Sequence, residues 1–229
     1  MAERVAVIAD IHGNFPALTA VLAELDAAGI SKIYCLGDLV GYYCQINEVI
    51  ATLRERHVTT VLGNHDHALA HLGGEIPRSR SATEVLKRQL EMIEPSHLEW
   101  LSALPRHMEF THGAKSYYAV HGGLDDPMDE YIRTIEPAYL ERHNFTHDVL
   151  LAGQTHVPLH VVLGAKAHAN PGSVGQPRDG DPRASYLVLE GPELVFHRVT
   201  YDVASLVARM QALGFPDYLY RRLESGLGV

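Results

Sequence analysis

The sequence predicts an α/β fold in which two mixed β-sheets pack face to face, with helices outside them. Apolar runs alternate with helical periodicity in the first half of the chain, and short strands separated by turns follow from Arg106 onward. The chain has 229 residues, 46% of them hydrophobic, which suffices for one sizeable core. We therefore expect a single domain over residues 1–229.

Repeated strand and helix signals organise the first half of the chain. The expected strands cover residues 5–9, 33–36 and 59–62, and apolar stripes with helical spacing cover 18–25 and 46–53. Pro16 suits the first turn of the first helix, and Gly29 can end that helix in a left-handed cap. Because helices connect these strands, we expect mainly parallel pairing with right-handed crossovers.

A helical insertion is predicted around residues 73–105. Ser81 and Glu84 have the spacing of a capping box, an apolar stripe follows over residues 85–93, and Pro95 suits the start of another helix. We expect this insertion to form part of a cleft wall.

The second half of the chain carries the signals of a second sheet. Two hairpins are expected, one turning at residues 112–114 and one over residues 185–200 that turns at Gly-Pro. Short apolar strands are expected at 117–120 and 149–152, and helices at 137–145 and 203–214. This pattern fits two sheets in a sandwich.

Five polar segments that directly follow predicted strands concentrate Asp, Asn and His. They are Asp-Ile-His at 10–12, Gly-Asp-Leu-Val-Gly at 37–41, Gly-Asn-His-Asp at 63–66, His-Gly-Gly at 121–123 and Gly-Gln-Thr-His at 153–156. Strand ends are where open α/β sheets bind ligands. The pattern is typical of a dinuclear metal site.

In this order, the five segments resemble the motifs of the calcineurin-like metallophosphoesterases. The tract over residues 170–179 is similar to that of the small single-domain bacterial and archaeal members of that superfamily. Five ordered motifs are far more specific than any one of them. The resemblance implies a four-layer αββα sandwich and a metal-dependent hydrolase of phosphate esters.

The resemblance also implies a set of metal ligands. Asp10, His12, Asp38 and His156 would hold one ion, and Asp38, Asn64 and His121 would hold the other, with Asp38 as the bridge. Mixed nitrogen and oxygen ligands suit two divalent transition-metal ions, manganese first, with iron, zinc, cobalt and nickel as alternatives. A hydroxide bridging such ions would attack phosphorus.

His65 is the expected catalytic residue beside the metals. It would face the bound phosphate and either donate a hydrogen bond to its oxygen or protonate the departing alkoxide. Asp66 either orients that imidazole or caps a short helix through Leu69.

Gln154 departs from the family pattern, in which His is common at this position as a ligand of the second metal. A neutral amide oxygen binds a borderline metal more weakly than imidazole does. Three alternatives follow: a weakened but working metal pair, a site completed by water, or a protein with one metal or none. The last alternative would make the chain a catalytically weakened or inactive scaffold or binding protein.

Residues outside the motifs have two interpretations each. Arg178 is the candidate substrate-binding residue because its guanidinium can bind a phosphate oxygen, although a surface ion pair is the alternative. Tyr42 and Tyr43 either stack on a nucleobase or pack at the cleft rim. His67 and His71 share a helical face that is either solvated or ligating.

The charge balance limits the partners. A net charge of -9 gives no general attraction for nucleic acid or anionic membranes, so long nucleic acid is disfavoured and no membrane partner is expected.

Tyr42 and Tyr43 stand where Ser/Thr protein phosphatases carry an Arg-containing extension. We therefore expect a phosphodiesterase, rather than a phosphomonoesterase, for small phosphodiesters or nucleotide-type substrates. The expected location is the cytoplasm, and the oligomeric state stays open.

Overall fold

The computed structural model describes residues 4–76 and 79–227, and over these ranges the strands form two five-stranded sheets. The strands are β1 Val5–Ile8, β2 Lys32–Cys35, β3 Thr59–Thr60, β4 His107–His112, β5 Lys115–Val120, β6 Val149–Ala152, β7 Leu159–Leu163, β8 Lys166–Asn170, β9 Ala184–Glu190 and β10 Glu193–Val199. The helices are α1 Phe15–Ala27, α2 Ile46–Glu55, α3 Asn64–His71, α4 Arg80–Met92, α5 Pro95–Ser102, α6 Pro137–Arg142, α7 Val203–Ala212 and the 3₁₀ helices η1 Asp217–Leu219 and η2 Arg221–Glu224.

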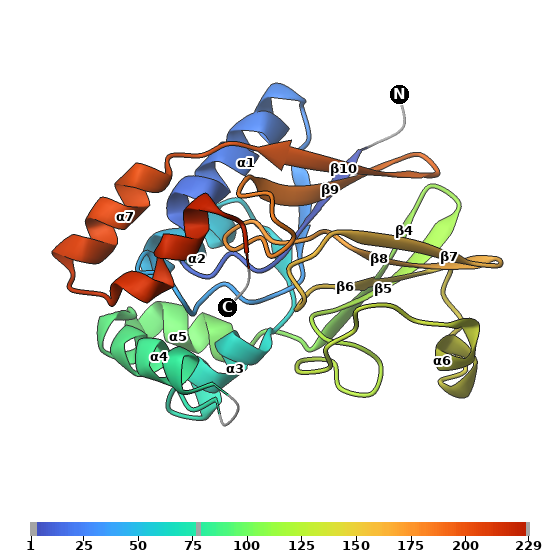
Figure 1. Ribbon diagram of the computed structural model, residues 1–229. Helices are drawn as coiled ribbons and strands as arrows, with labels where there is room; N and C mark the ends of the chain where they lie inside the picture. Colours follow the sequence, from blue (N-terminus) through green and yellow to red (C-terminus); the bar gives the residue numbers. More distant parts are fainter. Residues whose placement is uncertain (1–3, 77–78, 228–229) are drawn as a thin grey trace.

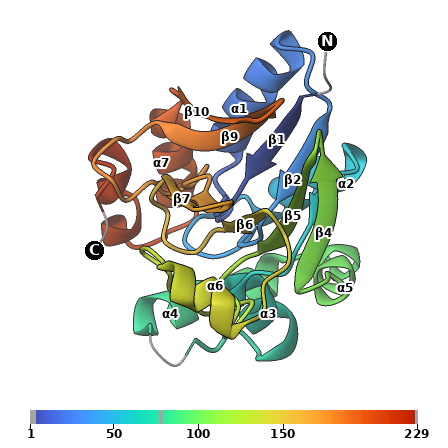
Figure 2. The ribbon, with the colours of Figure 1, turned by 90° about the vertical axis from the view of Figure 1, so that its right-hand side faces the viewer.

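Both sheets are mixed, as predicted. The first has the order β10-β9-β1-β2-β3, in which β1, β2 and β3 are parallel and β9 and β10 are antiparallel additions. The second has the order β4-β5-β6-β8-β7, with β5, β6 and β8 parallel between two antiparallel edge strands. Figure 2 shows β1 beside β2 and β4 beside β5.

Two apolar layers cover the two faces of the first sheet. Alternate β1 residues, Ala6 and Ile8, face a helical layer that includes α1 and α2, while Val5 and Val7 face the second sheet. Successive side chains of a strand point to opposite faces, so β1 is buried on both faces. In Figure 1, α1, α2 and α7 lie on one side of the molecule and α6 on the other.

The outer face of the second sheet is covered by the segment that includes α6. Val120 and Leu150 of this sheet pack against Ile132, Ile135 and Leu140. The four layers therefore have the predicted αββα order, with the thinnest helical layer over the second sheet. Both predicted hairpins are confirmed: β4 with β5, and β9 with β10.

The predicted capping box at Ser81 and Glu84 is wrong. Helix α4 begins at Arg80, and Ser79 is its N-cap, with its hydroxyl accepting a hydrogen bond from Ala82 N–H. The two serines are separated by one residue, and the side chain at 79 is the one that reaches an unpaired amide of the first turn. Helices α4 and α5 both lie within the predicted insertion.

Across residues 4–76 and 79–227, no helix combines the length and the apolar composition that crossing a membrane requires.

Candidate metal centre

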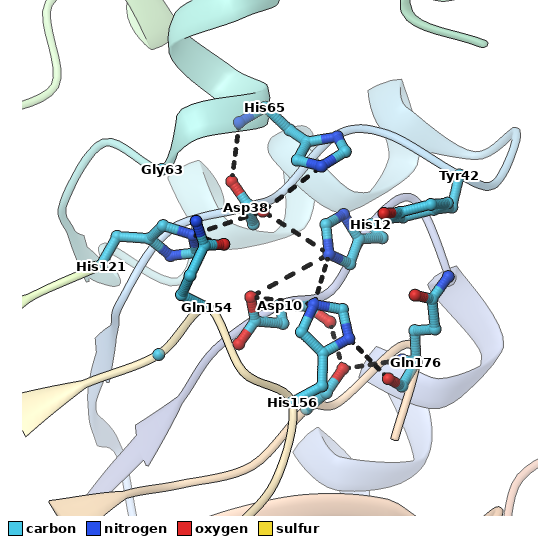
Figure 3. Close-up of polar contacts among 12 residues, drawn as sticks. Asp10, His12, Asp38, Tyr42, Gly63, His65, His121, Gln154, His156 and Gln176 are labelled. Carbon is cyan, nitrogen blue, oxygen red and sulfur yellow. Dashed lines mark hydrogen bonds and ion pairs between the residues drawn. The ribbon is translucent and has the colours of Figure 1, made fainter. Parts of the chain in front are cut away.

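The predicted ligands converge where strands of both sheets end (Figure 3). Asp10 and His12 follow β1, Asp38 follows β2, Asn64 and His65 begin α3 after β3, His121 follows β5, and Gln154 and His156 follow β6. The turns after β1 and β2 are joined by backbone hydrogen bonds from Asp10 N–H to Gly37 O at 3.0 Å and from His12 N–H to Asp38 O at 2.9 Å.

Left-handed backbone conformations concentrate at this convergence. Six of the eight non-glycine residues with positive φ in the described part of the chain lie here: Asp10, His12, Asp38, Tyr42, Gln154 and His156. Such conformations are unfavourable for residues with a Cβ and persist where surrounding contacts hold them. All six lie in the segments that follow β1, β2 and β6.

Two motif glycines allow close approach to these side chains. A Cβ on Gly63 would lie 2.1 Å from Asp38 Oδ1, and a Cβ on Gly41 would lie 2.3 Å from His65 Nδ1. Both distances are far inside van der Waals contact. Glycine is therefore required at these two positions by packing against the site.

Asp38 lies at the centre of the cluster. Its Oδ2 is 3.4 Å from His121 Nε2, 3.6 Å from His12 Nε2 and 4.0 Å from His65 Nε2. Its Oδ1 accepts a hydrogen bond from His65 N–H at 2.9 Å. One oxygen is thus fixed by the backbone and the other faces three imidazoles.

The three predicted histidine ligands present the same nitrogen to the centre. Nδ1 of His12, His121 and His156 lies 2.7, 2.8 and 2.6 Å from the carbonyl oxygens of Val40, Leu36 and Gln176. Because a carbonyl can only accept, each Nδ1 carries the proton of that hydrogen bond. Nε2 is the nitrogen left to face inward, which is how a second partner orients a metal-binding imidazole.

Burial sets the ionisation of the first group of ligands. It lowers the pKa of His12 and of His156 well below the usual value and raises the pKa of Asp10 to about 8. The two neutral imidazoles place their Nε2 lone pairs 3.1 Å apart, with Asp10 Oδ1 3.4 Å from His156 Nε2. Two nitrogen lone pairs that face one another at this distance repel unless a cation binds between them.

Orphaned oxygens support the same conclusion. Both carboxylate oxygens of Asp10, Oδ2 of Asp38 and Oδ1 of Asn64 are buried without a hydrogen-bond partner among the described residues. Unpaired buried carboxylate oxygens are costly unless a cation binds them. Three groups could hold an ion with ligand atoms within 4.8 Å of one another: Asp10 with His12 and His156, Asp10 with Asp38 and His121, and Asp38 with His12 and His65. The residues present therefore fit bound metal ions.

Gln154, whose role at the second predicted metal position was left open, lies next to His121. Its Oε1 lies 3.0 Å from His121 Nε2, so the amide oxygen points into the centre. The pKa of His121 is raised to about 10, because the attraction of Asp38 outweighs the opposing effect of burial. The pKa of Asp38 lies below its ordinary value because His121, His65 and His12 together outweigh its burial.

Asp129 is a residue of this position that the sequence did not indicate. Its Oδ1 accepts hydrogen bonds from Asn64 Nδ2 at 3.2 Å and from Gln154 Nε2 at 3.3 Å. The segment from Asp125 to Glu130 is rich in acids, and no spacing singles out one of them.

Asp66 has a role that neither of its interpretations named. Its carboxylate accepts hydrogen bonds from the backbone N–H groups of Asp38, Leu39, Val40 and Gly63 at 2.8 to 3.2 Å. It therefore fixes the turn that carries Asp38. It is the third residue of α3, after the N-cap Gly63, so it is not itself the cap.

His65 stands beside the ligands. Its ring centroid is 4.9 Å from that of His12 and 5.0 Å from that of Tyr42, and its Nδ1 has no partner in residues 4–76 or 79–227. Burial lowers its pKa, so the imidazole is neutral near pH 7. A neutral imidazole can donate from one nitrogen and accept at the other.

Arg178 lies beside Tyr42 at the edge of the candidate ligand cluster, and its backbone N–H donates to His156 O at 3.2 Å. It donates to Gln176 Oε1 at 2.7 Å and to Tyr42 Oη at 3.2 Å, which are both neutral partners. Tyr42 packs edge-on against His12 with ring centroids 4.7 Å apart, whereas Tyr43 is fully buried. On α3, the His67 and His71 rings lie 5.0 Å apart, outside the three groups that could hold an ion.

The αββα sandwich and the Asp, Asn and His cluster at its strand ends define a metal-dependent phosphoesterase. A family model, the calcineurin-like phosphoesterase superfamily domain, matches residues 4–192. The chain belongs to this superfamily.

Similar proteins cover most of the chain, and two of them cover nearly all of it. The solved structure of a metallophosphoesterase from Sphaerobacter thermophilus has a TM-score of 0.81 and 34% identity, over 99% of this chain and all (100%) of that one. The uncharacterised protein MJ0912 of Methanocaldococcus jannaschii is 31% identical over 97% of this chain and 98% of its own length. The phosphodiesterase YfcE of Escherichia coli is 26% identical over 81% of this chain and 86% of its length.

Proposed function

We propose that this chain is a manganese-dependent phosphodiesterase for small phosphodiesters or nucleotide-type substrates. The observation that carries the proposal is the set of buried, unpaired ligand atoms around Asp10 and Asp38. Asp10, His12, Asp38 and His156 would hold one ion, and Asp38, Asn64, His121 and Gln154 the other. Bound metal ions supply Lewis acidity toward a phosphoryl oxygen and an activated water.

His65 is the proposed catalytic residue among the protein's own groups. Its neutral ring lies beside Asp38, with Nε2 4.0 Å from Asp38 Oδ2, on the side of the centre that Tyr42 adjoins. From this place it would donate a hydrogen bond to the reacting phosphate or protonate the departing alkoxide.

The preference for diesters rests on the surroundings of the centre. Tyr42 occupies the place after the second motif where an arginine clamp would bind a terminal phosphate, so the site presents an aromatic ring there. The name of YfcE as a phosphodiesterase supports the same class.

The alternative function, a scaffold or binding protein on this fold, is motivated by Gln154. Against it stand the facing Nε2 atoms of His12 and His156 and the backbone strain at the candidate ligand positions. A scaffold needs neither feature, because both oppose stability unless a cation is bound.

The test measures metal content and hydrolysis on the same sample. Manganese is titrated into metal-stripped protein, and bis(p-nitrophenyl) phosphate and p-nitrophenyl phosphate are offered as diester and monoester. We expect diester hydrolysis that rises as the second equivalent binds. Two bound ions without turnover of either ester would favour the scaffold, and faster turnover of the monoester would overturn the diester preference.

Variants of two histidines on α3 identify the catalytic residue. His65→Ala should lower kcat by about 100- to 10,000-fold and leave the manganese stoichiometry unchanged. His67→Ala is the matched control, because His67 packs on His71 outside the ligand cluster, and it should behave as the wild type. Equal activity of the two variants would remove His65 from the mechanism.

A further inference from the structure

A cavity of about 680 Å³ adjoins the metal centre. Tyr42 belongs to both: its ring contacts His12 and His65 of the centre, and it also lines the cavity. Three arginines line the cavity as well, Arg133, Arg178 and Arg222. Of these, only Arg178 was singled out by the sequence.

Arg178 and Arg222 converge on the same two groups. Their guanidinium carbons lie 5.7 and 5.1 Å from the centroid of the Tyr42 ring. Both guanidinium groups also donate to Gln176 Oε1, from Arg178 Nη2 at 2.7 Å and from Arg222 Nη1 at 3.5 Å. Two cations therefore share one neutral oxygen and one aromatic ring.

No carboxylate of the described residues forms an ion pair with Arg133, Arg178 or Arg222. Moreover, Nε of Arg222 is buried and, over residues 4–76 and 79–227, lacks a hydrogen-bond partner. Elsewhere on the chain, arginines such as Arg56 and Arg183 pair with nearby aspartates. In a chain of net charge -9, unpaired arginines gathered in one cavity indicate a site for an anion.

We propose that Arg178 and Arg222 bind a second phosphate group of the substrate, one that is not cleaved. This proposal rests on the proposed function and narrows it to substrates with two phosphates. Both guanidinium groups pack on the ring of Tyr42, which also contacts the imidazoles of His12 and His65, so the arginines flank the centre and would hold a group next to the phosphate at the metals. Guanidinium groups suit this task because each can donate two parallel N–H hydrogen bonds to the oxygens of one phosphate.

The remaining walls of the cavity suit the organic part of such a substrate. Val157 and Leu159 supply apolar surface, and Tyr131, whose hydroxyl donates to Thr155 O at 3.3 Å, supplies a second aromatic ring. A nucleoside with two phosphates, one of them esterified, has this combination of flat base and separated anions.

The test compares two esters with the same leaving group on the manganese-loaded full chain. One is the p-nitrophenyl ester of thymidine 5′-phosphate, and the other is the same ester with a second phosphate on the 3′-oxygen. We expect kcat/KM to be about tenfold higher for the second ester. Arg222→Gln should lower the ratio of the two kcat/KM values about tenfold. Arg222→Lys should give an intermediate ratio, because lysine keeps the positive charge but lacks the paired N–H donors of a guanidinium group.

Arg221→Gln is the matched control. Arg221 precedes Arg222 in η2, pairs with Asp217 and has 76% of its side chain exposed, so its loss should leave both esters unaffected. Equal kcat/KM for the two esters in the wild type, or equal effects of the Arg221 and Arg222 variants, would overturn the proposal.

A binding measurement separates this proposal from the hydrolase itself. Metal-stripped protein is titrated calorimetrically with thymidine 3′,5′-bisphosphate in the presence of a chelator. Binding by the wild type that Arg222→Gln weakens tenfold or more would support the anion site even where neither ester is hydrolysed. Equal binding by the wild type and the Arg222→Gln variant would contradict the proposed anion site, whatever the result of the hydrolysis assay.

Discussion

The side-chain amide of Gln154 donates a hydrogen bond to Asp129 Oδ1 at 3.3 Å. This contact fixes which end of the amide faces the centre, because the nitrogen is held by the carboxylate and the oxygen is left 3.0 Å from His121 Nε2. The same Oδ1 accepts from Asn64 Nδ2, and Asn64 Oδ1 is left buried without a hydrogen-bond partner among the described residues. One carboxylate thus holds both amide nitrogens and leaves both amide oxygens free to bind an ion at the proposed second position.

Removal of Asp129 should therefore weaken the second manganese site. We expect Asp129→Ala to raise the Kd of the second ion by about 10- to 100-fold, the usual effect of losing a group that orients a ligand, and to leave the first ion unaffected. Calorimetric titration of metal-stripped protein measures both. Asp125→Ala is the control, because Asp125 is an acid of the same loop that is half-exposed and pairs with Arg142. A similar loss in both variants would contradict the orienting role.

Gln154→His should strengthen the second site. Imidazole is a better ligand for a borderline metal than an amide oxygen, and we expect the Kd of the second manganese ion to fall by about tenfold. The measurement is the same titration, with diester hydrolysis followed at a manganese concentration below the wild-type Kd. Unchanged or weaker binding would show that Gln154 does not limit the site.

Metal removal should lower the melting temperature. The buried oxygens of Asp10 and Asp38 and the facing Nε2 atoms of His12 and His156 are unfavourable without a cation. Manganese at about 100 times its Kd should stabilise the fold by about 2.7 kcal/mol. For a chain of this size that corresponds to roughly 5 to 10 °C in a calorimetric scan. Asp38→Ala should abolish the shift, and a shift that survives in this variant would place the ion elsewhere.

Acid should destabilise the fold through His168, which lies opposite Leu150 of β6 in the second sheet. The ring is fully buried, neither nitrogen has a partner among the described residues, and burial lowers its pKa to about 4. The unfolded chain therefore binds the proton more readily than the folded chain. The stabilising contribution is fully present above the unfolded pKa of about 6.5 and is lost as the pH falls to about 4, a change of about 3 kcal/mol.

His168→Leu should remove this part of the pH dependence. Urea unfolding between pH 7 and pH 4, in the presence of a chelator, should show a shallower loss of stability in the variant than in the wild type. The exposed His160 of β7 provides the control, and His160→Leu should keep the wild-type slope. Parallel slopes for all three proteins would exclude the role of His168.

The strands, and the convergence of the candidate ligands at their ends, could be predicted from the sequence because the signals are local. The apolar runs before Asp10 and Asp38 identify strands, and the polar residues directly after them must lie at the strand ends. Asp129 and Arg222 could not be found in this way. They reach the site from an irregular loop and from a 3₁₀ helix, and only the packing of those segments on distant parts of the chain brings them there.

The capping error at α4 has a similar cause. Ser79 and Ser81 are both suitable N-caps by residue type, and the spacing to Glu84 favoured the wrong one. Helix α4 also packs on the loop after β2, where Gln89 Oε1 accepts a hydrogen bond from Gly41 N–H at 2.8 Å. Local spacing contains no information on that contact.

The left-handed backbone conformations at the candidate ligand residues lower the stability of the fold, while the side chains at these positions serve the proposed metal centre. Glycine would relieve roughly 1 kcal/mol at each of Asp10, His12 and Asp38. A directed-evolution experiment that selects only for heat resistance of the metal-free protein should therefore enrich glycine at these codons and erase the site. Selection under manganese should preserve them, so the two regimes would drive the same positions in opposite directions.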